Sequence, residues 1–260
     1  MEICTNEHPI RFSYVHTPIR EKKVFSKDMH AEYEMLLFLE GGLSYMVEDR
    51  KFEVSPYTLI LVSPNTYHFA VPQGEGVYCR YMLAFKAQAV DADLLEKTFS
   101  RSGCYRLEES HPVVQSFRQL HALRTEALAD VDNLLLQSAC TQILLGLLAR
   151  QRMPEERISH AERTLSYPLI DYIEENLTTI RSVEEIAAHF YVSASTISHH
   201  FKSRMGISLM QYIRQKRLLL ARRLLEQGEK PQGAAEKAGF REYSTFYKAY
   251  IRHFGEAPSR

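Results

Sequence analysis

Two short helical patterns, about fifty residues apart, constrain the fold of this chain more than any other feature. The first occupies residues 182–206, SVEEIAAHFYVSASTISHHFKSRMG. Ser182 stands three residues before Glu185, which is the spacing of a capping box at a helix start. Apolar residues then recur every three or four positions, and Ser193 precedes a second such run. The pattern predicts two amphipathic helices that meet at a tight turn.

A second pair of helices is predicted at residues 231–255, where a short alanine-containing helix, a turn and another helix precede Gly255. A long amphipathic helix, from Leu209 to an expected C-terminal cap at Gly228, joins the two pairs. Two helices held in this way can enter successive segments of the major groove of DNA. Taken alone, the first pair fits an ordinary helical hairpin equally well, and its repetition favours a DNA-reading unit.

The distribution of charge supports this interpretation. The 260 residues contain 32 Lys+Arg and 32 Asp+Glu, so the whole chain is neutral. Residues 160–260 carry 15 basic and 11 acidic residues, whereas residues 1–159 carry 17 and 21. Residues 186–225 contain seven Lys or Arg and no acid, although a solvated helix surface normally mixes signs. This acid-free stretch therefore favours a nucleic-acid partner.

The first half of the chain has the pattern of short β-strands. Between about residues 24 and 85, apolar and polar residues alternate or apolar residues run in short bursts, separated by turn-forming residues. Strands are expected at residues 34–39, 43–47, 51–54, 58–62 and 77–85. Many short strands at this spacing predict a sandwich or a barrel.

Long helical patterns replace the strands after residue 91. One helix is expected over residues 113–128, and Asp132 opens a second, strongly apolar helix that continues to Leu148. A helix this apolar needs a partner on more than one side. It either packs within the chain or joins two copies of the chain in a dimer. Residues 151–166 are polar and contain Pro154, which indicates an interdomain linker.

Two segments of the strand-rich half match a known barrel motif. The first is His30-Ala-Glu-Tyr-Glu34 followed by Glu40-Gly41-Gly42, and the second is Ser63-Pro64-Asn65-Thr66-Tyr67-His68. With Pro56 between them, these residues resemble the cupin family, specifically the ligand-sensing cupin of AraC-type regulators. Metal-binding cupins take two histidines and a glutamate from the first motif and a third histidine from the second. Here Asp28 stands at the first histidine position, and Tyr57 stands where a glycine usually follows Pro56.

The resemblance places His30, Glu34 and His68 together in the mouth of the barrel. These side chains suit a divalent metal, hydrogen bonds to a polar ligand, or bracing of the barrel by buried polar contacts. Because Asp28 replaces a histidine, we expect no metal and no cofactor, and we assign His30, Glu34, Tyr45 and His68 to effector binding. Further candidates for an aromatic wall, which suits a sugar or another polar ring, are Tyr33, Tyr67 and Tyr81.

From Leu169 onward the chain resembles the AraC/XylS DNA-binding domain, most specifically at Gly239-Phe240 and Phe254-Gly255. The resemblance implies base contacts at Ser195, Ser198, His199, Tyr243, Ser244, Tyr247 and Lys248. Candidates for phosphate contacts are Thr196, Lys202 and Arg252. On the joining helix, four basic residues are expected to be available to solvent or to phosphate, namely Arg214, Lys216, Arg217 and Arg222.

The second helix pair departs from the family pattern in its first helix. Gly233 and Ala234 stand where the family prefers a helix former and a bulky aliphatic residue. Glycine costs about 1 kcal/mol in a helix interior, and the lost bulk thins the core. We therefore expect the second unit to be less stable than the first, or to contribute less to DNA recognition.

The sequence thus predicts an α+β protein of two domains. We expect a cupin-like ligand-sensing β-barrel over residues 1–90, helices for packing and dimerisation over 91–155, a linker over 156–166 and a DNA-binding domain with two helix-turn-helix units over 167–260. The resemblance implies a transcription regulator, more often an activator than a repressor, with promoter DNA, a small-molecule effector, a second copy and RNA polymerase as partners. Two alternative functions are a cupin enzyme, which needs the complete set of metal ligands, and a protein-interaction adaptor, which leaves the acid-free stretch unexplained.

No segment suggests export or membrane insertion. The first residues lack the apolar core of a signal peptide, and the longest apolar run, residues 143–149, is far shorter than a membrane span. The four cysteines, Cys4, Cys79, Cys104 and Cys140, lie far apart without a C-x-x-C pair, which indicates reduced and mostly buried thiols. We therefore expect a soluble, cytoplasmic protein that is not an enzyme.

Overall fold

A computed structural model describes residues 9–19, 27–48, 50–99, 103–126, 132–149 and 166–259. The chain divides into two compact units, Met1–His160 and Ala161–Arg260. Antiparallel strands and helices build the first unit, whereas the described part of the second contains helices alone. The predicted α+β class with two domains is confirmed. The predicted linker lies outside the described residues except for Ser166, where α4 begins.

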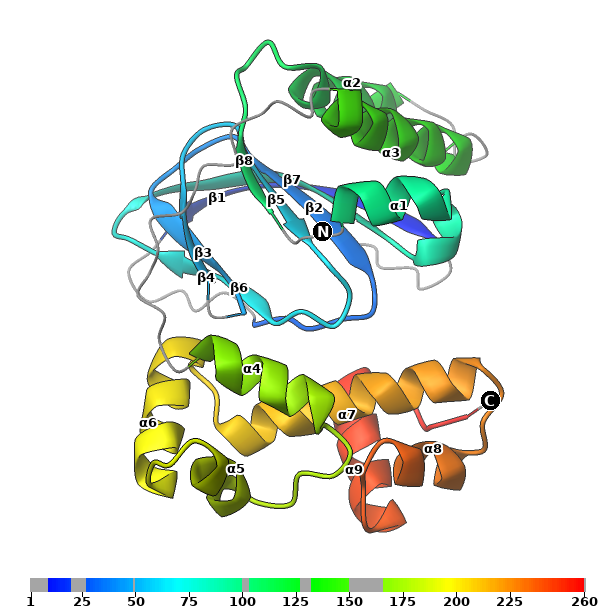
Figure 1. The fold of residues 1–260 in the computed structure, drawn as a ribbon. Helices are drawn as coiled ribbons and strands as arrows, with labels where there is room; N and C mark the ends of the chain where they lie inside the picture. The colour runs from blue at the N-terminus through cyan, green and yellow to red at the C-terminus, as the bar shows by residue number, and fades with distance from the viewer. Residues whose placement is uncertain are drawn as a thin grey trace. The chain divides into compact units, whose positions relative to one another are not determined.

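The first unit is built on two antiparallel sheets (Figure 1). The larger sheet has the order β1 (Ile10–Ile19), β7 (Gly76–Phe85), β2 (Tyr33–Phe38), β5 (Thr58–Val62) and β8 (Cys104–Arg106). The smaller sheet has the order β4 (Arg50–Val54), β3 (Leu43–Val47) and β6 (His68–Pro72). Apolar side chains from both sheets, among them Phe38, Phe52 and Val62, form one buried cluster. This arrangement is cupin-like.

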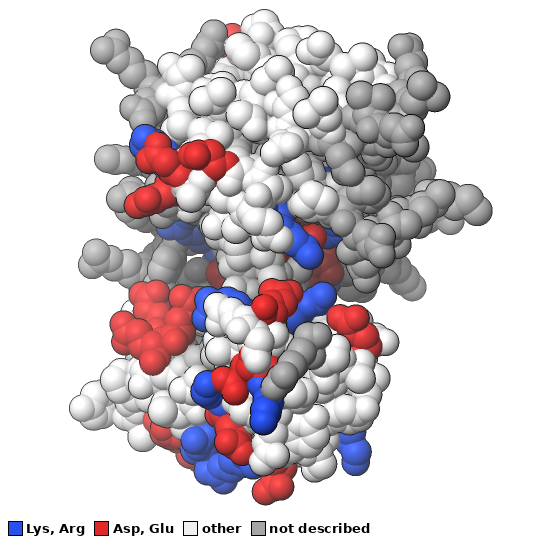
Figure 2. Space-filling view, turned by 90° about the vertical axis from the view of Figure 1, so that its right-hand side faces the viewer, with Lys and Arg blue, Asp and Glu red and all other residues white. Residues whose placement is uncertain are grey.

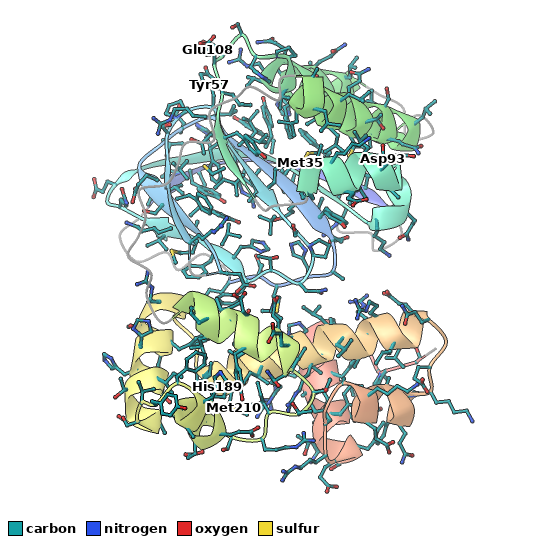
Figure 3. All side chains as sticks on the ribbon, in the orientation of Figure 1. Met35, Tyr57, Asp93, Glu108, His189 and Met210 are labelled. Atoms are coloured by element: carbon teal, nitrogen blue, oxygen red, sulfur yellow. The ribbon has the colours of Figure 1, made fainter. Side chains whose placement is uncertain are left out.

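The alternation of side chains along β2 explains why helices cover one face of the larger sheet. Leu36 and Phe38 point into the barrel, whereas Met35 and Leu37 point to the opposite face and join a second apolar cluster. That cluster includes buried residues of α1 (Ala92–Phe99), α2 (Pro112–Glu126) and α3 (Asp132–Ala149), with η1 (Ala87–Ala89) beside them. Figure 3 shows Met35 between the sheet and these helices. Both faces of β2 are therefore buried.

Three of the observed strands, β1, β6 and β8, are not among those predicted from the sequence. β1 pairs with β7 from Ile10↔Phe85 to Ile19↔Gly76, but most of its side chains are partly exposed, so it lacks the apolar run of a buried strand. β6 follows a turn and ends at Pro72, and β8 has three residues that pair with β5. Because β8 returns to the larger sheet, the barrel extends past residue 90, where the sequence places its end.

Tyr57 occupies the turn position at which the cupin motif usually has glycine, and its φ is +62°. Glycine adopts this left-handed conformation more readily than any other residue, which explains the family preference. Contacts on both sides hold the turn, because Tyr57 N donates to Phe38 O (2.7 Å) and Tyr57 O accepts from Leu107 N (3.1 Å). The departure from the motif therefore changes the residue and keeps the turn.

The helical unit contains α4 (Ser166–Glu175), α5 (Val183–His189), α6 (Ala194–Met205), α7 (Leu209–Glu226), α8 (Pro231–Lys237) and α9 (Tyr243–Phe254). The predicted caps of the first pair are confirmed, because Ser182 accepts from Glu185 N and Ser193 from Thr196 N. Gly206 and Gly255 end α6 and α9 in the left-handed conformation, with φ of +68° and +76°. Helix α7 joins the two pairs as predicted.

The structure describes three of the four cysteines. Cys79, Cys104 and Cys140 are buried free thiols, and Cys4 lies outside the described residues. Among the helices that the structure describes, none combines the length and the apolar character needed to cross a bilayer.

Candidate functional site

Helix α6 presents a polar row to solvent and buries an apolar one. Ile197 and Phe201 are at most 1% exposed, whereas the five residues predicted to contact DNA lie on other faces of the helix. Four of them are exposed and one is half-buried, in the order Ser195, Thr196, Ser198 (half-buried), His199 and Lys202. The Thr196 hydroxyl lies 2.7 Å from that of Ser193, so it also takes part in the helix cap.

Helix α9 repeats this division. Phe246 and Tyr250 are buried, and the residues predicted to contact DNA are exposed, namely Tyr243, Ser244, Tyr247, Lys248 and Arg252. The exposed fractions of Tyr243 and Tyr247 are 41% and 39%, and their ring centroids lie 6.0 Å apart. Both tyrosines are therefore partly covered, and the remainder of each side chain is open to a partner.

The basic residues of α7 do not share one environment, and the expectation that all four are available was wrong for two of them. Lys216 and Arg217 are 7% and 9% exposed. Lys216 Nζ donates to Glu174 Oε1 (2.8 Å), and Arg217 donates to the carbonyl oxygens of Leu177 (2.8 Å) and Ile180 (2.5 Å). Helix periodicity alone does not reveal this, because the carbonyls come from the loop after α4.

Acidic residues from outside the acid-free stretch neutralise part of its charge. Arg222 forms ion pairs with Glu226 and Glu256, and Lys216 pairs with Glu174. Figure 2 shows basic and acidic side chains interleaved over the face of the helical unit that is turned to the viewer. The stretch without acids in the sequence therefore does not form a uniformly basic surface.

In the barrel, the structure brings together the three polar residues predicted from the cupin motifs. Glu34 Oε2 lies 3.2 Å from His68 Nε2, and Glu34 Oε1 lies 3.5 Å from His30 Nε2. Glu34 and His68 are 7% and 2% exposed. His68 Nδ1 donates to Thr66 O (2.8 Å), which orients the ring so that Nε2 faces the carboxylate. The ring of Tyr45 stacks on His68 at 6.2 Å.

Opposing effects act on the charges of this trio. Burial alone would raise the pKa of the Glu34 carboxyl, but His30 and His68 outweigh it and hold that pKa well below its usual range. Burial alone would lower the pKa of His30, but the Glu34 carboxylate outweighs it and raises that pKa. A negative carboxylate against a protonated imidazole is therefore the favoured state.

The same three residues have the chemistry of a metal site. One ligand atom from each lies within 4.8 Å of the others, and two imidazoles with a carboxylate suit a divalent transition metal. The hydrogen bond from His68 Nδ1 to a carbonyl is also the orienting contact that metal-bound histidines use. Because the protonated pair accounts for the same geometry, the arrangement fits effector contact, bracing of the barrel and metal binding alike.

The comparisons with known proteins follow the two halves of the chain. Residues 13–144 match the family model of the AraC-like ligand binding domain, about half of the chain, and residues 186–260 match that of a helix-turn-helix domain. The chain belongs to the AraC family of transcriptional regulators. It is accordingly a DNA-binding regulator with a ligand-binding domain.

Relatives of this AraC-family chain include regulators of similar length. The probable transcriptional regulator LumQ of Photobacterium leiognathi is 28% identical over 237 residues, covering 89% of this chain and 90% of LumQ. The transcriptional regulatory protein HptR of Staphylococcus aureus is 31% identical over 91 residues, 35% of this chain and 36% of HptR. Among solved structures, ToxT of Vibrio cholerae is 12% identical with a TM-score of 0.41, covering 95% of this chain and 96% of ToxT.

Within this AraC-type barrel, Arg80 is a further candidate for ligand contact that the sequence does not predict. It projects from β7 beside Phe38 of β2, and its guanidinium lies 5.6 Å from the ring centroid of Tyr78. Its Nε and Nη1 are buried without a hydrogen-bond partner among the described residues. Tyr78 belongs, with Tyr45, to the cluster between the sheets. A lone arginine in a strand carries no sequence signal, because its burial depends on which face of the sheet the register gives it.

Two of the tyrosines proposed for the effector wall face the other way. Tyr33 packs against Phe85 and Phe99, under α1, and Tyr81 stacks on Phe117 of α2. Both belong to the cluster between the larger sheet and the helices, so they do not line the barrel interior. Tyr45 does belong to the interior cluster. The error arises because both faces of β2 and β7 are apolar, which hides the direction of each side chain.

Proposed function

We propose that this regulator is a transcriptional activator that reads promoter DNA with α6 and α9 and is controlled by a small polar effector in its barrel. The observation that carries the proposal is the matched design of the two reading helices. Each buries one apolar row, exposes a polar one, and ends at a left-handed glycine. Base contacts come from Ser195, Ser198, His199, Tyr243, Ser244, Tyr247 and Lys248, and phosphate contacts from Thr196, Lys202 and Arg252.

The effector acts by binding the DNA-competent and the DNA-free states of the regulator with different affinities, which linkage requires. Activation would then proceed through contact of the DNA-bound regulator with RNA polymerase. A reporter gene under its promoter, with and without the regulator, measures the sign. Higher transcription with the regulator supports an activator, and lower transcription contradicts it.

Replacement of single residues on the reading helices should weaken binding to promoter DNA unequally. We expect His199→Ala to cost about 1–3 kcal/mol, the range for a good base contact, and Lys248→Ala to cost less. The reason is the thinner core of the second unit at Gly233 and Ala234. Fluorescence anisotropy at fixed salt measures both variants against the unmodified chain.

The control for this comparison is Lys97→Ala, which removes an exposed positive charge from α1 in the barrel unit. It should leave the affinity for DNA unchanged. A loss from Lys248→Ala equal to or larger than that from His199→Ala would contradict the ranking of the two units. Absence of salt-sensitive binding by the unmodified chain would remove the proposed function itself.

The effector site comprises His30, Glu34, Tyr45 and His68, with Arg80 added from the register of β7. Arg80 supplies two nitrogens, Nε and Nη1, without a hydrogen-bond partner among the described residues, and the trio supplies both donors and an acceptor. Aromatic faces beside such groups suit a ligand that carries several oxygens on a compact ring, so a sugar is our proposed class. Metal is not needed for this role.

A thermal-shift screen of the full chain against sugars and small carboxylic acids tests the effector site. A sugar present at about 100 times its Kd should stabilise the barrel by about 2.7 kcal/mol. Arg80→Met keeps the apolar stem and removes the donors, so it should abolish that stabilisation. Stabilisation by acids alone would replace the sugar class. Stabilisation that persists in Arg80→Met would take Arg80 out of the site.

A homodimer through α3 completes the proposal. Leu134 and Leu145 are 67% and 53% exposed, and they lie about three turns apart on one side of the helix. Leu123 of α2 adds a third exposed apolar side chain. Such side chains on neighbouring helices favour an apolar partner, and a second copy is the partner that we propose. Sedimentation of the full chain as a monomer at micromolar concentration would remove this part of the proposal.

A further inference from the structure

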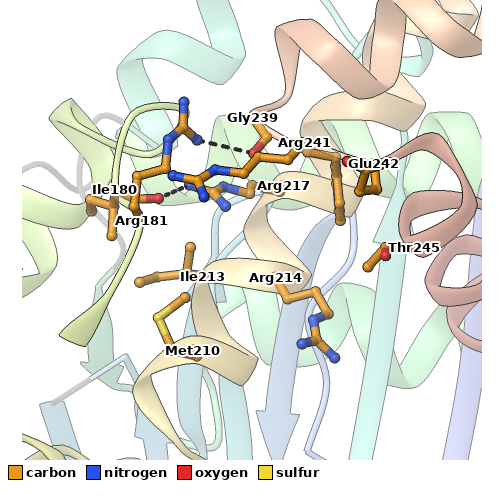
Figure 4. Close-up of a pocket in the computed structure, with 11 residues that line it drawn as sticks. Ile180, Arg181, Met210, Ile213, Arg214, Arg217, Gly239, Arg241, Glu242 and Thr245 are labelled. Carbon is orange, nitrogen blue, oxygen red and sulfur yellow. Dashed lines mark hydrogen bonds between the residues drawn. The ribbon is translucent and has the colours of Figure 1, made fainter.

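A pocket of about 210 Å³ in the helical unit gathers four arginines (Figure 4). Three segments of the chain form its walls. They are the residues before α5 with Arg181, the first half of α7 with Arg214 and Arg217, and the turn into α9 with Arg241. The pocket lies between the two helix-turn-helix units, and we call it the arginine pocket.

Two of the four arginines hold the walls together. Arg217 donates to the carbonyls of Leu177 and Ile180, as described above. Arg181 Nη1 donates to Thr178 O (3.1 Å) and to Gly239 O (3.4 Å), which ties the loop before α5 to the turn after α8. These contacts preorganise the pocket without neutralising it, because carbonyl oxygens carry no net charge.

The other two arginines remain available to a ligand. Arg214 and Arg241 are exposed, and neither side chain forms a hydrogen bond or an ion pair with another residue that the structure describes. Glu242 is the acid in the lining, and Glu185 lies outside it, where Oε2 accepts from Arg181 N (2.8 Å). Burial and then the charge of Arg181 lower the pKa of Arg217, as expected where positive charges are not compensated.

This concentration of positive charge favours a compact oxyanion. Four guanidinium groups against one carboxylate leave the lining with a net positive charge. Guanidinium forks match the oxygens of phosphate in pairs, and they are better suited to it than single-point donors. A pocket of this volume has room for a tetrahedral anion together with several waters.

We propose that the arginine pocket binds a phosphate group, and that in the DNA complex this group is a backbone phosphate between the segments read by α6 and α9. The DNA part rests on the proposed function. The pocket ends at Glu242 and Thr245, which flank the first two reading residues of α9. A recognition helix presents its N-terminal residues to the bases, so the backbone passes nearby. A phosphate held there fixes the register of both reading helices at once.

The test is a double variant, Arg214→Met with Arg241→Met, in the full chain. Both residues are exposed, so the fold should be retained, and circular dichroism checks it. We expect affinity for promoter DNA to fall at least tenfold. The slope of log K against log salt should fall by about one, as expected for the loss of one phosphate contact. A control with Lys51→Met and Lys97→Met removes two exposed charges from the barrel unit and should change neither quantity.

Two further measurements distinguish a free phosphate from a phosphate of the DNA backbone. Inorganic phosphate, compared with chloride at equal ionic strength, should raise the melting temperature of the unmodified chain and not that of the double variant. The second measurement uses promoter DNA in which one linkage is a neutral methylphosphonate, placed in turn at each position between the two segments read by α6 and α9. At one position, this linkage should weaken DNA binding by the unmodified chain and leave DNA binding by the double variant unchanged.

Each combination of outcomes decides the proposal. Unchanged DNA affinity and salt slope, together with no phosphate-dependent stabilisation, overturn it completely. Stabilisation by phosphate with unchanged DNA affinity supports a site for a free phosphate-bearing molecule and overturns the DNA part. If the unmodified chain does not bind promoter DNA, the proposed function fails, and the measurement with inorganic phosphate still decides whether the pocket binds an oxyanion.

Discussion

Replacing Gly239 by alanine should destabilise the helical unit by about 3–4 kcal/mol, more than most single substitutions do. Gly239 has φ of +88°, and a Cβ there would lie 2.6 Å from Thr178 O and 2.8 Å from Thr178 Cα. It would also lie 3.0 Å from Arg217 Nε, which already donates a hydrogen bond to Leu177 O. Because two of these atoms belong to the backbone, the turn must move away from the loop after α4.

Gly228 provides a matched control for this prediction. Its φ of +90° is nearly the same, but a Cβ there would meet no atom within 4 Å. Gly228→Ala should therefore cost only the backbone strain, about 1 kcal/mol. Since the chain has no tryptophan, urea unfolding is followed by circular dichroism, with amide hydrogen exchange in α9 to localise the effect. Equal costs for the two variants would contradict the close approach at Gly239.

Gly239→Ala should also weaken DNA binding. Arg181 Nη1 donates to Gly239 O, so a displaced turn loosens the link between the two helix pairs and the wall of the arginine pocket. Helix α9 begins three residues after Phe240, so its reading residues move with the turn. Weaker binding by Gly239→Ala at a temperature where the unit stays folded would separate this effect from unfolding.

The helical unit was largely predictable from sequence because its signals are local. Ser182, Ser193 and Gly206 act through atoms within a few residues of themselves, so spacing alone locates the helix ends. The division of α6 and α9 into buried and exposed rows follows from the helical period in the same way. The burial of Lys216 and Arg217 did not follow, because their partners lie about forty residues away, in α4 for Lys216 and in the loop after α4 for Arg217.

The barrel was predictable in kind and less so in detail. The resemblance to the cupin motifs predicts that His30, Glu34 and His68 lie together, although they come from two strands and a loop. The structure bears out their proximity. The sequence does not predict strands β1 and β8, because they form through pairing with β7 and β5 and their own composition does not indicate a strand. Arg80 and the arginine pocket depend on register and on segments distant in sequence, which no single window contains.

Glu34→Gln should change both the stability of the barrel and its dependence on pH. The pKa of Glu34 is lower in the folded chain than in the unfolded chain, so its ionisation stabilises the fold above about pH 4.5 and less as the pH falls. The pKa of His30 is higher in the folded chain, so its protonation stabilises the fold below about pH 6.5 and less as the pH rises through the folded pKa. Both contributions are complete only between these two values.

The barrel of the unmodified chain should therefore be most stable near pH 5–6, and Glu34→Gln should cost it about 3 kcal/mol there, as expected when a buried charge loses its partner. The cost should shrink on either side of this window, because the net stabilisation that the two ionised groups contribute to the unmodified chain declines there. Glu53→Gln removes an exposed carboxylate of β4 paired with Lys51 and should cost less than about 1 kcal/mol. Hydrogen exchange of amides in β2 and β6, measured from pH 4 to 8, follows the barrel separately from the helical unit. If the two variants gave the same profile, the charged pair between Glu34 and His30 would contribute nothing to the stability of the barrel.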